Sequence, residues 1–122
     1  MITLEIRSAV EQRTINEVTR QREEQERRER QEKAIEKFFN YCKKQIETSS
    51  YESIWFTLMR KDVLKFMDVD YLSSEDENFF VKQVVTIVKD VLAEAGYELG
   101  VDIYSVGWQN RSGKYASCHI KF

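Results

Sequence analysis

The sequence predicts an α+β fold: a long charged N-terminal helix, a central apolar helix and a small antiparallel sheet with a C-terminal β-hairpin. Two features of the composition carry this prediction. All 15 aromatic residues lie between Phe38 and Phe122, so the side chains that can build a core are confined to that part. Before residue 34, seven of the eight basic residues are Arg and every acid is Glu, and both types are good helix formers. We therefore divide the 122-residue chain into a charged helical arm (1–33) and a compact α+β core (34–122).

The arm is predicted to be helical, although its start stays open. Three alternating apolar residues near the N-terminus fit a short strand, whereas Ser8 and Thr14, each followed three residues later by Glu, fit helix-capping boxes. Between Thr19 and Lys33 no residue is apolar, and eleven of the 15 are charged. Opposite charges four residues apart stabilise such a helix by about 0.2–0.5 kcal/mol per pair. The pairs with this spacing are Glu23–Arg27, Glu24–Arg28, Glu26–Arg30 and Glu29–Lys33.

From Ala34 the helix becomes amphipathic. Its apolar residues at helical spacing are Ile35, Phe38, Phe39, Cys42 and Ile46. A helix from Ala9 to Glu47 is about 60 Å long at 1.5 Å per residue, whereas a core of this size is about 25–30 Å across. The helix must therefore project beyond its core, either as a solvated rod or packed on another chain. The charged stretch lacks the apolar seam of a conventional coiled coil.

The segment 52–60 (ESIWFTLMR) is predicted to be a strand because it is rich in β-branched and aromatic residues. A helix over 51–67 is the alternative, since Trp55, Met59, Val63 and Phe66 also fit helical spacing. Residues 62–67 are expected to form a short helical turn.

The central apolar helix is predicted over residues 75–95. Ser74 and Glu77 fit a capping box at its start, and polar residues recur at helical spacing along it. Its long apolar remainder implies near-complete burial. Gly96 supplies the left-handed residue that ends the helix.

Residues 99–108 and 115–122 are predicted to be the two strands of the terminal hairpin. Strict alternation in the last strand places one set of side chains on the core and the other set outward. The expected core set is Ala116, Cys118, Ile120 and Phe122, and the expected outward set is Tyr115, Ser117, His119 and Lys121.

The hairpin is the candidate binding site. Tyr, Trp and Arg are enriched at binding hot spots, and they also stack on bases and nucleotides. The candidate residues are Tyr104, Trp108, Arg111, Lys114 and Tyr115, with Arg111 at the tip. We expect them to bind a protein; the alternatives are a small ligand such as a nucleotide, a nucleic acid, or a purely structural role in closing one side of the sheet.

Neither a catalytic site nor a cofactor is predicted. Cys118 and His119 are neighbours on a strand, so their side chains point to opposite faces and cannot easily meet. Asp68 and Asp70 would share a face of an extended segment, as a Mg²⁺ or Ca²⁺ pair requires. A solvated loop is the stronger interpretation of these two acids, and we therefore assign no metal site and no enzymatic activity.

The charge balance of the chain limits the kinds of partner that it is expected to bind. The chain carries 19 basic and 21 acidic residues, which gives a net charge of −2. It lacks the positive excess that general nucleic-acid or anionic-membrane binding usually needs. No apolar run approaches the ~20 residues of a membrane span, and no signal-peptide segment is seen. Two cysteines in unrelated segments are typical of free thiols in a reducing compartment, so we expect a cytoplasmic protein.

The arm also predicts self-association. The flat guanidinium of Arg pairs bidentately with carboxylates, so two arms that run in opposite directions can satisfy each other. Exposed ion pairs contribute only about 0–1 kcal/mol each, and association therefore needs apolar contacts. The residues expected to supply them are Leu4, Ile6, Val10, Ile15 and Val18 at one end, and Ile35, Phe38 and Phe39 at the other. The expectation is an antiparallel homodimer, or a higher homo-oligomer, that weakens with salt.

The order of elements resembles that of small uncharacterised bacteriophage proteins. The resemblance lies in the Met-Ile-Thr start, the segment ESIWFTLMR, the helix ending AEAGYEL and the hairpin ending SCHIKF. It covers most of the chain as a pattern, assigns no functional residues, and does not include the Arg/Glu arm. It implies a phage accessory protein that binds a protein in the host cytoplasm. We therefore expect a non-enzymatic, self-associating protein-binding module, in its most concrete form an inhibitor of a host protein.

Overall fold

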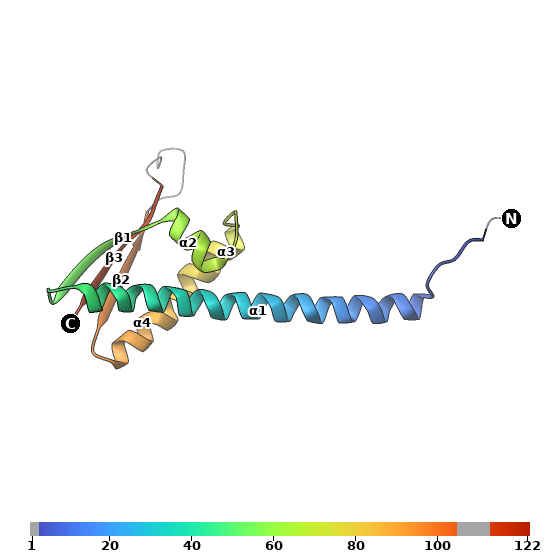
Figure 1. The fold of residues 1–122 in the computed structure, drawn as a ribbon, viewed down its shortest axis with the longest axis horizontal. Helices are drawn as coiled ribbons and strands as arrows, with labels where there is room; N and C mark the ends of the chain where they lie inside the picture. The colour runs from blue at the N-terminus through green and yellow to red at the C-terminus, as the bar shows by residue number, and fades with distance from the viewer. Residues whose placement is uncertain (1–2, 105–112) are drawn as a thin grey trace.

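The computed structural model describes residues 3–104 and 113–122 and confirms the predicted α+β fold (Figure 1). The elements are α1 (Ala9–Thr48), β1 (Ser53–Met59), α2 (Arg60–Met67), α3 (Ser74–Phe79), the π-helical segment η1 (Phe80–Val84), α4 (Val85–Glu94), β2 (Glu98–Ile103) and β3 (Lys114–Lys121). The described strands form one antiparallel sheet in the order β1-β3-β2. The strand predicted over 52–60 is thereby confirmed. The alternative, one helix over 51–67, is wrong because only residues 60–67 are helical.

Helix α1 runs without interruption for 40 residues. Ser8 caps it, since its Oγ accepts a hydrogen bond from the backbone N–H of Glu11 at 3.2 Å. At 1.5 Å per residue the helix is about 60 Å long, and Figure 1 shows its N-terminal part projecting beyond the core. Residues 3–30 are all exposed. Of the predicted Glu-to-basic pairs the structure forms Glu24–Arg28, with 2.8 Å between nitrogen and oxygen.

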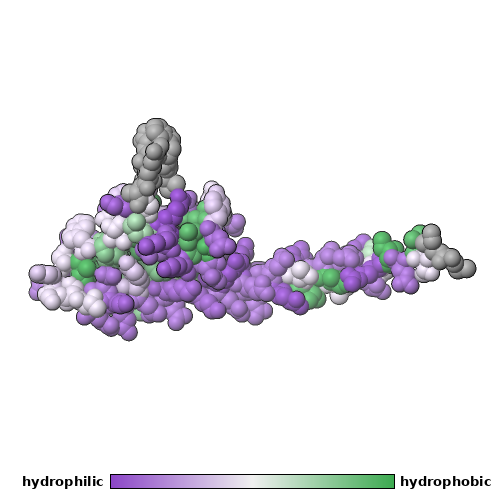
Figure 2. Space-filling view, turned by 45° about the horizontal axis from the view of Figure 1, so that its top comes forward, coloured by the Kyte–Doolittle hydropathy of each residue, from purple (hydrophilic) through white to green (hydrophobic). Residues whose placement is uncertain are grey.

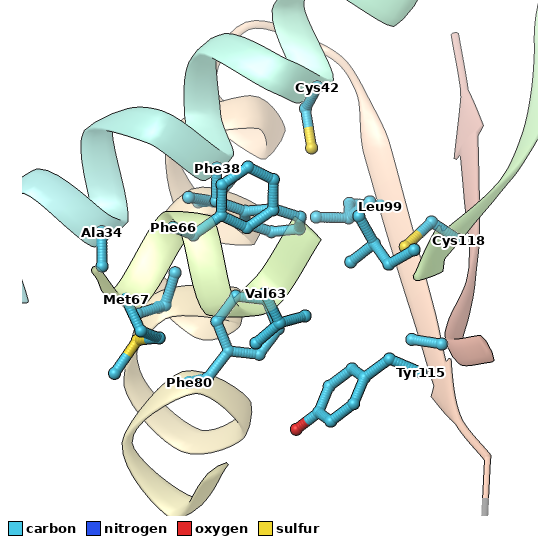
Figure 3. Packing of buried hydrophobic residues seen from close by; sticks show 14 of the residues in the cluster. Ala34, Phe38, Cys42, Val63, Phe66, Met67, Phe80, Leu99, Tyr115 and Cys118 are labelled. Atoms are coloured by element: carbon cyan, nitrogen blue, oxygen red, sulfur yellow. The ribbon is translucent and has the colours of Figure 1, made fainter. Parts of the chain in front are cut away.

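Phe38 lies at the centre of the hydrophobic core (Figure 3). Its ring centroid is 5.8 Å from that of Phe66 and 5.4 Å from that of Phe80. The Phe38 side chain is 0% exposed. The prediction that Phe38 serves self-association is therefore wrong, because its own chain covers it completely. The neighbouring apolar residues of α1 that pack partly buried against the same core are Ile35 and Phe39.

The N-terminal cap of the central helical run lies one residue earlier than predicted. Ser73 Oγ accepts from the backbone N–H of Asp76 at 3.1 Å, and Asp76 Oδ2 accepts from the backbone N–H of Ser73 at 3.3 Å. The predicted pairing of Ser74 with Glu77 is wrong. Glu77 instead forms an ion pair at 3.1 Å with Arg60 of α2, which ties two helices together.

A π-helical turn adjusts the central run to its core. The buried residues of the run recur every four positions, at Phe80, Val84, Val88 and Leu92. The near-complete burial predicted for this helix is therefore wrong, because apolar residues on its other side are exposed, among them Ile87 and Val91. In an α-helix four residues turn through about 400°, so each buried side chain would point about 40° further around the helix axis than the one before. The wider i→i+5 turn of η1 rotates less per residue and keeps the buried side chains on one side. At the other end, Gly96 adopts φ +93° and the N–H of Tyr97 donates to the carbonyl of Leu92 at 2.9 Å. Gly96 therefore ends the helix in the left-handed conformation, as predicted, and the two residues form a Schellman motif.

A β-bulge redirects Tyr115. The pairing of β1 with β3 joins Leu58 to Ala116 but Met59 to Lys114, so Tyr115 is the extra residue. Its side chain turns into the core and is 3% exposed. The outward face predicted for Tyr115 is therefore wrong. The core-facing alternation predicted for the rest of this segment is confirmed at Ala116, Cys118 and Ile120, whereas it is wrong for Phe122, which is 46% exposed just beyond the end of β3.

Candidate binding surfaces

The sheet has one covered face and one open face. Along β1, Ile54 and Leu58 are buried, and Phe56 packs on Tyr41 of α1 with 5.6 Å between ring centroids. The alternate side chains of β1 point away from the helices and are exposed. We call this outward surface the open sheet face; it consists of Ser53, Trp55, Thr57, Glu98, Gly100, Asp102, Ser117, His119 and Lys121.

Trp55 dominates the open sheet face. Its side chain is 68% exposed, although the indole stacks on the imidazole of His119. The two ring centroids are 3.9 Å apart and the ring planes differ by 14°. The register explains the contact, because Trp55 on β1 lies directly opposite His119 on β3. An exposed Trp held in one orientation loses little conformational entropy when it binds a partner.

Two further residues complete the surroundings of His119. Ser53 Oγ lies 2.8 Å from His119 Nε2, which fixes the imidazole from one side. Gly100 pairs with His119 from β2, and a Cβ placed there would meet only the His119 carbonyl oxygen, at 4.0 Å. The surface therefore presents two aromatic rings beside bare backbone, and a planar or extended group can approach closely there.

The Ser53–His119 contact is not a complete catalytic constellation. A nucleophile–base pair needs a third group that orients the base. Within residues 3–104 and 113–122 no carboxylate contacts the other nitrogen of His119, and Trp55 covers a face of its ring. This arrangement suits binding better than nucleophilic chemistry.

The charges of the open sheet face are mixed. Lys121 lies between Ser53 and Glu98 in the register, and Asp102 lies opposite Ser117. The open sheet face therefore carries one basic residue and two acidic residues. Phosphate backbones are attracted by a positive excess, which this face lacks.

The three predicted hairpin residues that the structure describes do not share one exposed surface. Tyr104 is 38% exposed, and its N–H donates to the carbonyl of Tyr115 at 2.9 Å. Lys114 is exposed at the start of β3, whereas Tyr115 is buried. Trp108 and Arg111 lie outside the described residues.

The reasoning from sequence missed Trp55, His119 and Ser53 as a group. The alternation within ESIWFTLMR was the available signal, because it sets Trp55 on the face opposite Ile54 and Leu58. The contact with Ser53 joins residues 66 positions apart and depends on the strand order.

Asp68 has a structural role. It ends α2 in the left-handed conformation with φ 54°, so it is not the extended residue that a shared face with Asp70 requires. Among the described residues no group of three His, Cys, Asp or Glu side chains gathers to hold a metal ion.

The two cysteines are buried thiols. Burial raises the pKa of Cys42 to about 12 and that of Cys118 to about 12. Cys118 is fully buried while His119 lies on the open sheet face, so the two point to opposite faces as predicted. Neither thiol is poised for nucleophilic chemistry, because the thiolate is the reactive form.

Comparisons with known proteins give no further indication. A scan against protein-family models finds no match, and searches of the curated proteins and of the solved structures find no significant match either. No helix in the described part of the chain is long and apolar enough to cross a membrane.

Proposed function

We propose that this chain is a non-enzymatic protein-binding module whose partner docks on the open sheet face around Trp55. The observation that carries the proposal is the 68% exposure of a Trp ring that is stacked in place on His119. Trp is the residue type most enriched at energetically dominant positions of protein interfaces. The contacts to His119 and Ser53 hold this surface in place before a partner arrives.

A protein is a better partner for this surface than a nucleic acid. The Trp55 and His119 rings would also stack on a base. However, Glu98 and Asp102 flank them on the same face and repel phosphates. The resemblance to phage accessory proteins makes a bacterial host protein the first class of partner to test.

Capture from bacterial lysate with matched variants tests the proposal. The full chain is immobilised as wild type, as Trp55→Ala and as Tyr71→Ala. Tyr71 is the matched control because it is an aromatic residue, 80% exposed, that lies outside the open sheet face. Circular dichroism verifies that all three variants are folded.

The proposal requires one protein band that wild type and Tyr71→Ala retain and that Trp55→Ala loses. A band retained equally by all three variants would place the partner elsewhere and overturn it. Loss of the band in both variants would indicate nonspecific aromatic adhesion. If instead an oligonucleotide, and no protein, shifts the fluorescence of Trp55 in a Trp108→Phe background, the surface binds nucleic acid and the proposal is wrong.

A further inference from the structure

The side of α1 that packs on the core continues into the arm as a row of alternating charge. Ala34 and Phe38 are the buried residues of this side of the helix. From Ala34 toward the N-terminus, the residues that follow at alternating three- and four-residue spacing are first Gln and then Arg and Glu in strict alternation. We call this row the charged seam; it consists of Gln31, Arg27, Glu24, Arg20, Glu17 and Arg13. The seam has the spacing of a coiled-coil interface, with charges where apolar residues normally lie.

Two hollows in the surface border the core-side half of the seam. Arg20, Glu24 and Arg27 line one shallow hollow on the arm, together with Glu23 and Arg30. Arg27 and Gln31 line a second hollow, of about 310 Å³, where the arm leaves the core. The apolar side of this second hollow is formed by Met67, Val69 and Phe79.

We propose that the arm binds the arm of a second copy of this chain, antiparallel and through the charged seam. In the proposed register Arg13 faces Glu24 of the second copy and Glu17 faces its Arg20. The two-fold symmetry repeats both contacts, so four successive layers each join an Arg to a Glu. Within one chain Glu24 Oε1 accepts from Arg28, and Glu17 forms an ion pair with Arg20. In the pair these carboxylates exchange to the Arg side chains of the second copy.

The charge pattern selects the direction of pairing. In a parallel pair each seam residue faces its own copy, so Arg would meet Arg and Glu would meet Glu in every layer. Like charges at such positions are destabilising. In an antiparallel pair the strict alternation of Arg with Glu brings opposite charges together.

The length of the free arm selects the register. Residues 3–30 are exposed, whereas Ala34 is fully buried by its own core. The proposed register sets Ala9, the first residue of α1, opposite Arg28 of the second copy, just before that core begins. If the two arms overlap by seven residues more, the first turn of α1 meets Ala34 of the second copy, which its own core covers. If they overlap by seven residues less, only two of the four Arg–Glu layers remain.

The same register gives the apolar tip of the arm a place to bind. Figure 2 shows the arm as a hydrophilic rod with hydrophobic residues near its free end. Val10 is 69% exposed and continues the row of the charged seam, whereas Ile6, 98% exposed, precedes the helix. In the pair Val10 reaches Arg27 of the second copy, which borders the second hollow with its apolar wall.

Ile15 and Val18 are not part of this interface. At 100° per residue they lie on the side of α1 opposite the charged seam, whereas the expected self-association residues Ile35 and Phe39 pack on the core. Because exposed ion pairs contribute little each, the proposed dimer is weak and dissociates as salt is raised.

Charge reversal on the full chain tests the proposal. One variant carries Arg13→Glu and Arg20→Glu, and a second carries Glu17→Arg and Glu24→Arg. A control carries Arg22→Glu and Lys33→Glu, which changes the net charge as much as the first variant does but off the seam. Light scattering gives the mass of each at low and high salt, and circular dichroism verifies that each remains helical.

The proposal predicts twice the 14.6 kDa chain mass for wild type and control at low salt, and the mass of one chain at high salt. Each seam variant should be a monomer, because the four positions that form the Arg–Glu layers, 13, 17, 20 and 24, then carry one sign of charge. An equimolar mixture of the two seam variants should recover the dimer. A monomeric wild type at low salt, or a mixture that stays monomeric, would overturn the proposal. A seam variant that remains dimeric would also overturn it.

Discussion

Trp55 and His119 face each other across β1 and β3, with ring centroids 3.9 Å apart and ring planes inclined by 14°. This contact explains how a Trp that is mostly exposed keeps one orientation. It also connects the sheet, whose register creates the contact, with the binding surface that we propose.

His119→Ala should weaken partner binding while leaving the fold intact. Removal of the imidazole frees the Trp55 ring, and the bound orientation must then be ordered at an entropic cost. Loss of an aromatic contact costs about 0.5–1.5 kcal/mol of unfolding free energy. Titration calorimetry with the captured partner, and urea unfolding, measure the two effects. Thr86→Ala, an exposed change on α4 that lies outside the open sheet face, is the control that should change neither.

Gly100→Ala and Gly96→Ala should separate binding from stability. A Cβ at Gly100 meets only one backbone atom, at 4.0 Å, so stability should change little, but the methyl group covers the bare backbone beside His119. Gly96 has φ +93°, which strains any L-residue and costs about 1 kcal/mol. Binding should therefore fall in Gly100→Ala alone, and the urea midpoint in Gly96→Ala alone. The opposite pattern would contradict the open sheet face as the site.

Phe38→Ala should destabilise the core by about 3–5 kcal/mol, because it leaves a cavity among fully buried side chains. Asn40→Ala, an exposed change on the same helix, should stay within about 0.5 kcal/mol of wild type. Equilibrium urea unfolding of the two variants distinguishes them. A Phe38→Ala variant as stable as wild type would contradict the central place of Phe38 in the core.

Alkaline pH should lower the stability of the fold. Burial raises the pKa of Cys42 and Cys118 from the ordinary value of 9.0 to about 12. Below pH 9 both the folded and the unfolded chain keep these protons, so the full stability is present. Between about pH 9 and pH 12 the unfolded chain releases them first, and the unfolding free energy falls by at most about 1.4 kcal/mol per pH unit and thiol.

Urea unfolding at about pH 7 and about pH 10 measures this dependence. A variant with Cys42→Ala and Cys118→Ala is the control; it should be less stable at both pH values but less dependent on pH. Thiol-reactive dye should label native wild type slowly and urea-unfolded wild type fast. Fast labelling of the native protein would show that the thiols are not buried.

Local chemistry was enough to predict α1, its projection and the stop at Gly96. The Arg/Glu composition, the Ser8 cap and Gly96, the first glycine of the chain, each act within a few residues, so the sequence carries them directly. The strand at 52–60 was predictable for the same reason, since its residue types favour a sheet.

The long-range features could not be predicted. Trp55 meets His119 only because β1 pairs with β3 in this register, and neighbouring sequence does not specify that pairing. A single extra residue in the ladder reversed the face of Tyr115. Phe38 was assigned to an interface because the pattern of α1 shows an apolar face but not what covers that face.

Site-specific photo-crosslinking tests the proposed binding surface most directly. A photoreactive amino acid replaces Thr57, which is exposed on the open sheet face and leaves Trp55 in place, or replaces Tyr71 as the control. After irradiation in bacterial lysate, the account predicts that position 57 yields one discrete crosslinked protein band and position 71 yields none. The band should disappear when Trp55→Ala is added. A discrete band from position 71 alone, or a band from position 57 that survives Trp55→Ala, would contradict the account.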